Sequence, residues 1–497
     1  MDKRNHIAIF DLGKTNQKVV LIDGKDLTKI DSRKAPNSVL KGLYPHLDTA
    51  SQWRFLCDCL SGFEQQHGVD GVAITTHGAT AALVVGDTLA LPVLDYEFEL
   101  PRSVDEAYNT LRPPFDETLS PRLPGGLNIG AQLYFLQTRF PKEFSRTEHI
   151  LTYPQYWSFR LTGLPHSEAT SLGCHTDLWQ PEMGRFSNLV GRILPEKLFP
   201  PLAKASDVFP LTSTAAQATG LRAGIPVTCG IHDSNASLVP WLNSGDPLSI
   251  VSSGTWTIVM SLGVPLGEMD AGRDMLANVD ALGRPTPTAR FMGGRDHELL
   301  TKGCVGSASL SDIAAVISKG IFIMPGRVPG VGPFPQARGG WRGAPPVGMA
   351  EKLASATLYL ALMTQTCLAL AGMGQRIILE GPLARNEPFA RCLSALTGVA
   401  VHVSADATGT ATGAALLLLK ADHDPRLGPA VQPVDLPGLS AYAQNWRAYA
   451  QQAREVGPRS SHMKYGLQWL GDGCIIRMGV HNIRHKRPPF LHDLSGG

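Results

Sequence analysis

The sequence lacks several features that would assign it to a large class of proteins. Its net charge is only +2 over 497 residues, which gives no electrostatic reason to expect a nucleic acid or an acidic membrane as partner. Its longest apolar run, residues 411–419, is interrupted by Thr412 and Gly413 and is far too short to span a bilayer. Residues 1–6 are followed by only four apolar residues, too few for the core of a signal peptide. The composition therefore fits a soluble globular enzyme without a nucleic-acid or membrane partner.

The cysteines are scattered rather than paired. The eight of them form no Cys-x-x-Cys motif and no spacing with histidine that is typical of zinc. We expect reduced thiols, and hence a cytoplasmic protein. A Walker A motif is also absent, so a nucleotide would have to be held by another kind of loop.

The chain is too long for a single hydrophobic core. Its 497 residues predict two substantial domains, which we place at 1–243 and 244–458. The polar, Gly- and Pro-containing stretch 239–247 is the expected crossing between them. Residues 459–497 are rich in His and Arg, show no clear periodicity, and are expected to be an appended or divergent tail.

The first candidate phosphate loop lies in residues 7–23. Four apolar residues run into Asp11, a polar turn follows, and a second β-branched run leads away, which predicts two strands joined by a hairpin. Gly13 lets the backbone approach a ligand, and Asp11 can hold a hydrated Mg²⁺ ion. The neighbouring groups that suit phosphate oxygens are the ammonium of Lys14, the hydroxyl of Thr15 and the amide of Asn16. An ordinary surface hairpin is the alternative for this segment taken alone.

A similar pattern recurs about 240 residues later, in residues 248–260. An apolar strand again enters a turn, here at Gly254 and Thr255, and an apolar strand leaves it. The repetition indicates an internal duplication in which two hairpins grip one phosphate chain. This layout resembles the ribonuclease H-like, actin-like ATPase superfamily, and we expect a two-domain α/β fold with a ligand cleft between the domains.

Two short segments could face a ligand. The strand at residues 71–75 ends in polar residues that include His77 and Gly78, and ligands gather at the carboxyl ends of strands in open α/β sheets. Asp95 and Tyr96 end another short apolar run. Carboxylates accept hydrogen bonds from sugar hydroxyls, and aromatic rings cover the C–H faces of sugars. An ordinary transition from strand to turn is the alternative at both places.

Asp233 is the candidate general base. An apolar strand ends in Gly230, then His232 and Asp233, and small polar residues begin a helix. A carboxylate fixed at this point could accept the proton of an attacking hydroxyl. Alternatively, Asp233 only caps the helix. Its position between the two phosphate-type hairpins favours the catalytic role.

The remaining pattern predicts several other elements. Apolar residues at helical spacing predict helices over 51–67, 129–140, 154–162 and 351–371. We expect a strand at 91–97, an extended loop at 101–128, a polar surface loop at 167–176 and a Gly-rich turn at 291–296. Gly381 would let a flat ring approach the backbone, and Asn386 announces a helix start.

These sites, in this order, resemble the FGGY carbohydrate kinase family, and within it the rhamnulokinase-like and fuculokinase-like branch. The resemblance covers roughly residues 6–450 and is carried by the segments 11–16, 230–233, 252–256 and 380–386. The chain differs from the usual pattern of the family in two places. The first loop has Lys14, Thr15 and Asn16 where Thr, Ser and Arg are common, and Glu380 replaces a glycine of the adenosine turn.

The resemblance implies a role for each matching residue. Gly13, Lys14 and Thr15 would form the first phosphate loop, with Asn16 beside them, and Gly254 and Thr255 the second. Asp233 would be the base, Asp11 and Asp233 would flank Mg²⁺, His232 and Gly78 would help bind the sugar, and Gly381 and Asn386 would lie by the adenosine.

The expected activity is ATP-dependent phosphorylation of a ketose such as L-rhamnulose or L-fuculose. A xylulose, ribulose or glycerol kinase of the same family is the nearest alternative. A nucleotide switch like actin or Hsp70, without a sugar substrate, belongs to a different class, and a catalytically idle sugar-binding regulator is a further alternative. A homodimer is compatible with each.

Overall fold

The computed structural model describes residues 5–404, 409–420, 427–455, 466–469 and 474–477. The chain divides into two units, residues 1–456 and residues 457–497. Within the second, β26 (Gly466–Trp469) and β27 (Cys474–Arg477) form an antiparallel hairpin. The rest of the predicted tail lies outside the described residues.

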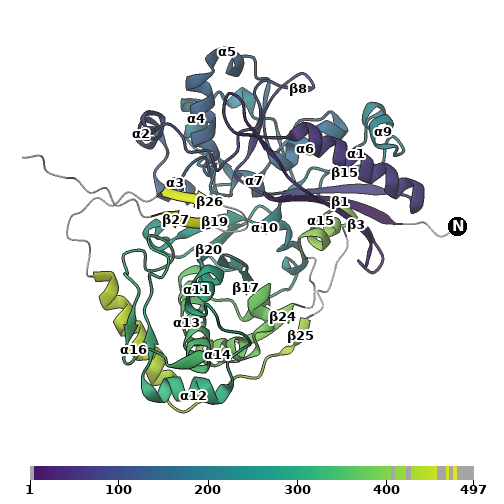
Figure 1. The fold of residues 1–497 in the computed structure, drawn as a ribbon. Helices are drawn as coiled ribbons and strands as arrows, with labels where there is room; N and C mark the ends of the chain where they lie inside the picture. The colour runs from purple at the N-terminus through teal and green to yellow at the C-terminus, as the bar shows by residue number, and fades with distance from the viewer. Residues whose placement is uncertain (1–4, 405–408, 421–426, 456–465, 470–473, 478–497) are drawn as a thin grey trace, which may run out of the picture. The chain divides into compact units, whose positions relative to one another are not determined.

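The first unit contains two seven-stranded sheets (Figure 1). The first sheet has the order β14 (Val208–Pro210), β15 (Pro226–Thr228), β6 (Gly71–Thr76), β1 (His6–Leu12), β2 (Asn16–Asp23) and β3 (Lys29–Pro36), and β16 (Ile231–His232) also pairs with β6. The second has the order β19 (Met275–Val279), β20 (Pro285–Phe291), β18 (Thr257–Leu262), β17 (Leu248–Ser253), β23 (Arg376–Glu380), β24 (Ala400–Ser404) and β25 (Leu427–Ala430).

The two sheets repeat one topology. From β3 to β15 the successive strand pairs are antiparallel, antiparallel, parallel and parallel, and the same sequence runs from β20 to β24. The hairpins β1–β2 and β17–β18 occupy equivalent places in this repeat. The duplication predicted from the two hairpins and the predicted α/β fold class are therefore confirmed.

Strand β1 is buried on both faces because its side chains alternate between two helical layers. Ala8 and Phe10 pack in one core with side chains of α1 (Thr49–Gln66) and α6 (Tyr153–Thr162). Ile7 and Ile9 pack in another core with alanines of α15 (Gly409–Leu419). Figure 1 shows α15 on the opposite side of β1 from α1. A helix from the second half of the chain thus covers the first sheet.

The second sheet is covered chiefly by α13 (Gly348–Ala371), together with α12 (Leu310–Lys319) and α14 (Glu387–Thr397). Helix α13 is long and apolar enough to cross a membrane by length and composition, but 78% of its apolar window is buried within the fold. It is the central core helix of this half.

Shorter elements and connecting helices lie between those already named. They are β4 (Val39–Leu40), β5 (His46–Leu47), β7 (Ala81–Val85), β8 (Thr88–Leu89), α4 (Ile129–Arg139), α5 (Pro141–Phe144), β9 (His149–Thr152), β11 (Trp179–Gln180), β12 (Arg185–Phe186), α8 (Leu189–Arg192), η1 (Glu196–Leu198), β13 (Leu202–Ala203), α9 (Ser213–Thr219), η2 (Val239–Trp241), η3 (Ala271–Arg273), β21 (Phe322–Ile323), β22 (Trp341–Arg342), η4 (Pro382–Arg385) and α16 (Leu439–Glu455).

The four predicted helices are confirmed as α1, α4, α6 and α13. Four other local predictions are wrong. Residues 91–97 form a turn with one bridge, from His46 to Leu94, instead of a strand. The expected loop 101–128 contains α2 (Arg102–Leu111) and α3 (Phe115–Thr118), and the expected turn 291–296 begins α11 (Gly293–Leu300).

The fourth wrong prediction is the surface loop at 167–176. This stretch forms β10 (Ser167–Glu168) and α7 (Ala169–Leu172) and is largely buried. Its polarity is compatible with burial because its groups satisfy each other. The Glu168 carboxylate accepts hydrogen bonds from the backbone N–H and hydroxyl groups of both Thr170 and Ser171.

Candidate active site

The first phosphate-type turn joins β1 to β2 and is anchored by Asn37. The Asn37 side-chain amide donates to the carbonyl oxygen of Gly13 at 2.7 Å, and its backbone N–H donates to the carbonyl of Thr15 at 2.9 Å. The Thr15 residue itself is exposed, whereas Asn16 is half-buried at the start of β2. A fixed backbone with an outward-facing hydroxyl is suited to an anionic ligand.

The second turn, at Gly254 and Thr255, is also exposed and is closed on one side by α11. The backbone N–H of Gly254 donates to the carbonyl of Trp256 at 2.8 Å. A side chain at Gly294 would collide with the carbonyl oxygen of Gly254, so α11 starts directly against the turn. This contact was not predicted from the sequence, although the consecutive glycines Gly293 and Gly294 after an apolar strand indicate a close approach of the backbone.

Asp11 and Asp233 lie at the carboxyl ends of two parallel strands, β1 and β16, that both pair with β6. Asp11 lies beside Thr75 in the β1–β6 pairing, and the β6–β16 pairing sets His232 beside Thr76. Asp233 follows directly as the first residue of α10 (Asp233–Ala236). Its carboxylate accepts a hydrogen bond from the Ser234 N–H at 2.6 Å and keeps 30% of its surface exposed.

The two carboxylates repel each other. Burial, followed by the negative charge of Asp233, raises the pKa of Asp11 from 3.8 to about 6, while Lys18 acts in the opposite direction. Among the residues that the structure describes, no three His, Cys, Asp or Glu side chains gather as a complete metal site. A pair of nearby carboxylates without further protein ligands suits a cation that keeps other oxygen ligands, as Mg²⁺ does when it binds phosphates.

His232 is buried in a tight polar environment. Its Nδ1 lies 2.6 Å from Asn235 Oδ1, and its Nε2 lies 3.3 Å from Asp233 Oδ1 and 3.8 Å from Cys174 Sγ. A Cβ at Gly78 would lie 2.7 Å from the same Nε2, so the ring fits only beside a glycine. Burial opposes protonation of the ring, but the electrostatic interactions with Cys174 and then with Asp233 outweigh burial and raise the pKa of His232. Cys174 was not predicted as part of the site.

The other sugar-type residues form a second group. The His77 ring is 5.5 Å from the Tyr96 ring, centroid to centroid, and burial lowers the pKa of His77 to about 4. His77 Nδ1 lies 2.9 Å from the Gly78 carbonyl oxygen. Because a carbonyl only accepts hydrogen bonds, Nδ1 carries the proton of this neutral ring and Nε2 is left as an acceptor.

Lys14 links the first turn to this group. Its ammonium forms an ion pair with the Asp95 carboxylate and lies 4.5 Å from the centroid of the Tyr96 ring. In this structure the lysine predicted for the phosphate loop therefore binds the carboxylate predicted for the sugar. Asp95 is buried, so this ion pair competes with a phosphate contact for the same ammonium.

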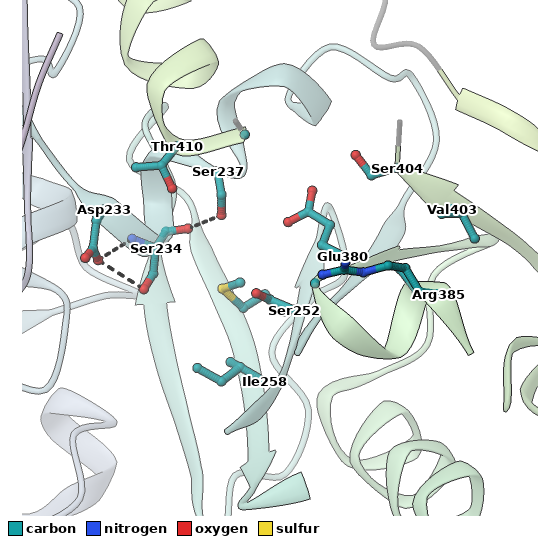
Figure 2. Close-up of a pocket in the computed structure, with 14 residues that line it drawn as sticks. Asp233, Ser234, Ser237, Ser252, Ile258, Glu380, Arg385, Val403, Ser404 and Thr410 are labelled. Atoms are coloured by element: carbon teal, nitrogen blue, oxygen red, sulfur yellow. Dashed lines mark hydrogen bonds between the residues drawn. The ribbon is translucent and has the colours of Figure 1, made fainter. Parts of the chain in front are cut away.

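A cavity of about 640 Å³ lies between α10 and the second sheet. Figure 2 shows Asp233 and Ser234 at one side of it and Glu380, Arg385 and Ser404 at the other. The full lining consists of Asp233, Ser234, Ser237, Ser252, Ile258, Met260, Glu380, Gly381, Ala384, Arg385, Val403, Ser404, Gly409 and Thr410.

The two residues predicted for adenosine are placed differently. Gly381 lines the cavity with φ +79°, and a Cβ there would collide with the Ser253 carbonyl oxygen. Asn386 is not part of the lining. Its side chain caps α14 by accepting a hydrogen bond from the Phe389 N–H at 3.1 Å. Gly381 therefore packs directly against the end of β17, the strand that leads into the second phosphate-type turn.

Comparisons with known proteins identify the family. Residues 245–426 match the C-terminal domain of the FGGY carbohydrate kinases. The structure of a carbohydrate kinase from Novosphingobium aromaticivorans is 35% identical with a TM-score of 0.84, and the match covers 89% of this chain and 100% of that one. The chain belongs to the FGGY carbohydrate kinase family. It is thereby grouped with the ATP-dependent sugar and polyol kinases.

Two further relatives bear on the fold and the substrate. An L-fuculokinase of Salmonella typhi is 28% identical over 285 residues, which are 54% of this chain and 58% of the fuculokinase, so the match spans little more than half of that enzyme. The xylulose kinase from Rhodospirillum rubrum has a TM-score of 0.73 at 17% identity and covers 90% of this chain and 98% of its own. The latter likeness establishes the FGGY kinase fold alone.

Proposed function

We propose that this FGGY kinase transfers the γ-phosphate of ATP to a hydroxyl of a ketose resembling L-rhamnulose or L-fuculose, with Asp233 as the general base. The observation that carries the proposal is the position of Asp233. Its partly exposed carboxylate lies in the lining of the cavity and interacts electrostatically with Asp11, near the end of β1. The L-fuculokinase relative supports a ketose over other acceptors.

In the proposed mechanism, catalysis comes mostly from the alignment of the phosphoryl donor with the acceptor hydroxyl. Phosphoryl transfer passes through a loose transition state, so the enzyme has to hold donor and acceptor in line and stabilise the charge on the phosphoryl oxygens. The turns at Gly13–Thr15 and Gly254–Thr255 would supply backbone N–H groups and hydroxyls to the phosphates. Asp233, fixed by the Ser234 N–H, would accept the proton of the sugar hydroxyl.

A divalent cation fits the acidic pair. Asp11 and Asp233 would hold Mg²⁺. Burial and the charge of Asp233 raise the pKa of Asp11 because they disfavour its ionised form, and a bound cation would stabilise that form. When bound, the ion supplies positive charge to the phosphate oxygens. The chain's own contribution is to hold both carboxylates at the ends of strands that pair with the same strand, β6.

The sugar would lie between the His232 and His77 groups. The Nε2 of neutral His77 can accept a hydrogen bond from a hydroxyl, Tyr96 offers a ring face or edge, and Asp95 offers acceptor oxygens. Gly78 leaves the space in which the His232 ring sits. The seven cysteines that the structure describes are free thiols, which supports the cytoplasmic location that we include in the proposal.

The test is a coupled assay of ADP formation with a panel of ketoses and polyols. We expect the highest kcat/KM with a 6-deoxyketohexose, and a loss of about a thousandfold in kcat for Asp233→Asn because the acceptor proton then has no base. The dissociation constant for ATP should change less than threefold. Asp246→Asn is the matched control, since Asp246 is exposed and outside the cavity lining.

Three outcomes would count against the proposal. Near-normal turnover by Asp233→Asn would reject Asp233 as the base. A preference for xylulose, ribulose or glycerol would assign the enzyme to another branch of the family. ATP hydrolysis that no sugar accelerates would favour a nucleotide switch.

A further inference from the structure

The cavity contains a second carboxylate, far from the one assigned to catalysis. Glu380 is the last residue of β23, and Figure 2 shows its side chain turned into the cavity on the side opposite to Asp233. Its Oε1 would lie 3.9 Å from a Cβ at Gly409, which places the carboxylate beside the beginning of α15.

The backbone under Glu380 is held firmly. The Ser253 hydroxyl donates to the Glu380 carbonyl oxygen at 2.6 Å and accepts from the Leu383 N–H at 3.0 Å. The next residue, Gly381, has the positive φ that glycine tolerates. Because Ser253 ends β17, the position of Glu380 is fixed relative to the second phosphate-type turn.

The charge of Glu380 restricts what it can bind. An ionised carboxylate is only an acceptor and, where it holds no divalent cation, it repels phosphate, so Glu380 is poorly suited to face the triphosphate of a bound nucleotide. The proposed function places the phosphates at the Asp233 side, where Mg²⁺ held by Asp11 and Asp233 would offset the negative charge of these two carboxylates. The nucleoside is therefore left for the Glu380 side, where apolar Ala384 and Val403 also line the wall.

Ribose hydroxyls are the donors that match this carboxylate best. The 2′- and 3′-hydroxyls are adjacent, and the two oxygens of one carboxylate can each accept a hydrogen bond from one of them. A carboxylate that binds a ribose 2′-hydroxyl is also a general solution in dinucleotide-binding folds.

We propose that Glu380 binds the ribose hydroxyls of the nucleotide and makes this kinase selective for ribonucleoside over deoxyribonucleoside triphosphates. The inference rests on the proposed kinase function for its kinetic test. It assigns a specificity-determining contact to the residue that replaces a glycine in the expected adenosine turn.

The experiment compares ATP, 2′-deoxy-ATP and 3′-deoxy-ATP as phosphoryl donors at saturating sugar. For the wild type we expect kcat/KM to be about tenfold or more higher with ATP than with either deoxynucleotide, because loss of a hydroxyl removes one of the two hydrogen bonds between the ribose and the carboxylate. Glu380→Ala should reduce this preference to within about threefold, and Glu380→Gln should lie between them. The KM for the sugar should stay within twofold in all variants.

A matched control and a binding assay separate the possible failures. Glu387→Gln makes the same chemical change on a side chain that is 77% exposed and outside the cavity lining, and it should keep the wild-type preference. Titration calorimetry with ATP and 2′-deoxy-ATP measures the same selectivity without a sugar, so it remains informative if no sugar supports turnover. Equal binding of the two nucleotides by the wild type, or an unchanged preference in Glu380→Ala, would overturn the inference. Thermal unfolding verifies that each variant is folded.

Discussion

The close packing of α15 against α10 gives a sharp prediction for Gly413. A Cβ at this position would lie more than 1 Å inside van der Waals distance of the Ala236 carbonyl oxygen, at the end of the helix that begins with Asp233. In Gly413→Ala the two helices have to separate. Overpacking of this kind costs roughly 1–3 kcal/mol, and the higher helix propensity of alanine offsets about 1 kcal/mol of it. We expect a net loss of stability of up to about 2 kcal/mol.

The same substitution should impair catalysis. A displacement of about 1 Å at a group that aligns the reaction can reduce the rate by about a hundredfold, so we expect kcat to fall by at least about tenfold. Urea unfolding measures the stability, and the coupled ADP assay measures kcat. An unchanged urea midpoint together with an unchanged kcat would refute the packing argument.

Gly409→Ala is the control for stability, since it makes the same change in the same helix. Among the residues that the structure describes, a Cβ at Gly409 would meet Glu380 Oε1 at 3.9 Å and Ser237 Cβ at 4.0 Å, both ordinary contacts. This variant should therefore be as stable as the wild type or more stable. Gly409 lines the cavity, so the comparison is restricted to unfolding.

Two other buried groups provide further predictions. Cys174→Ala should raise the KM for the sugar about three- to tenfold and leave the KM for ATP within twofold, because His232 loses its sulfur neighbour at 3.8 Å; Cys174→Ser should recover only part of the effect, since a hydroxyl can contact the ring but carries no charge, and equal kinetics for all three proteins would exclude a positioning role. Burial raises the pKa of Asp296 from 3.8 to about 6, despite its hydrogen bond from Tyr359. Its contribution to stability is thus present below pH 4 and is lost as the pH rises through about 6, so the stability of Asp296→Asn relative to wild type, measured by urea unfolding, should increase by up to about 3 kcal/mol over that range. A difference that does not vary with pH would contradict this assignment.

The sequence was informative where one local pattern determines one element. The hairpin at Gly13 and its counterpart at Gly254 could be found because each is a strand, a turn and a strand within about 15 residues. Helices α1, α4, α6 and α13 have apolar residues at helical spacing, so their positions were predicted within a few residues. In α2 the same signal was present in Val104 and Tyr108, but the surrounding Pro and Arg residues obscured it.

The site contacts that the sequence did not predict are non-local. Cys174 and His232 are 58 positions apart, and Lys14 and Asp95 are 81 apart. The polar composition of residues 167–176 also led to the wrong prediction that Glu168 lies on the surface. A carboxylate whose hydrogen-bond donors lie within three residues can be buried inside a polar stretch. Such pairings depend on how strands and helices are assembled, which no residue pattern within one segment records.

The exchange of helices between the two halves explains how the site is built. Helix α10 follows the first sheet and brings Asp233 into a cavity whose lining comes mostly from the second half. Helix α15 comes from the second half and buries Ile7 and Ile9 of the first sheet. The two helices contact each other at Gly413, which leaves no room for a side chain. Each half of the repeat therefore needs the helix of the other, because α15 completes the first core and α10 supplies the proposed base.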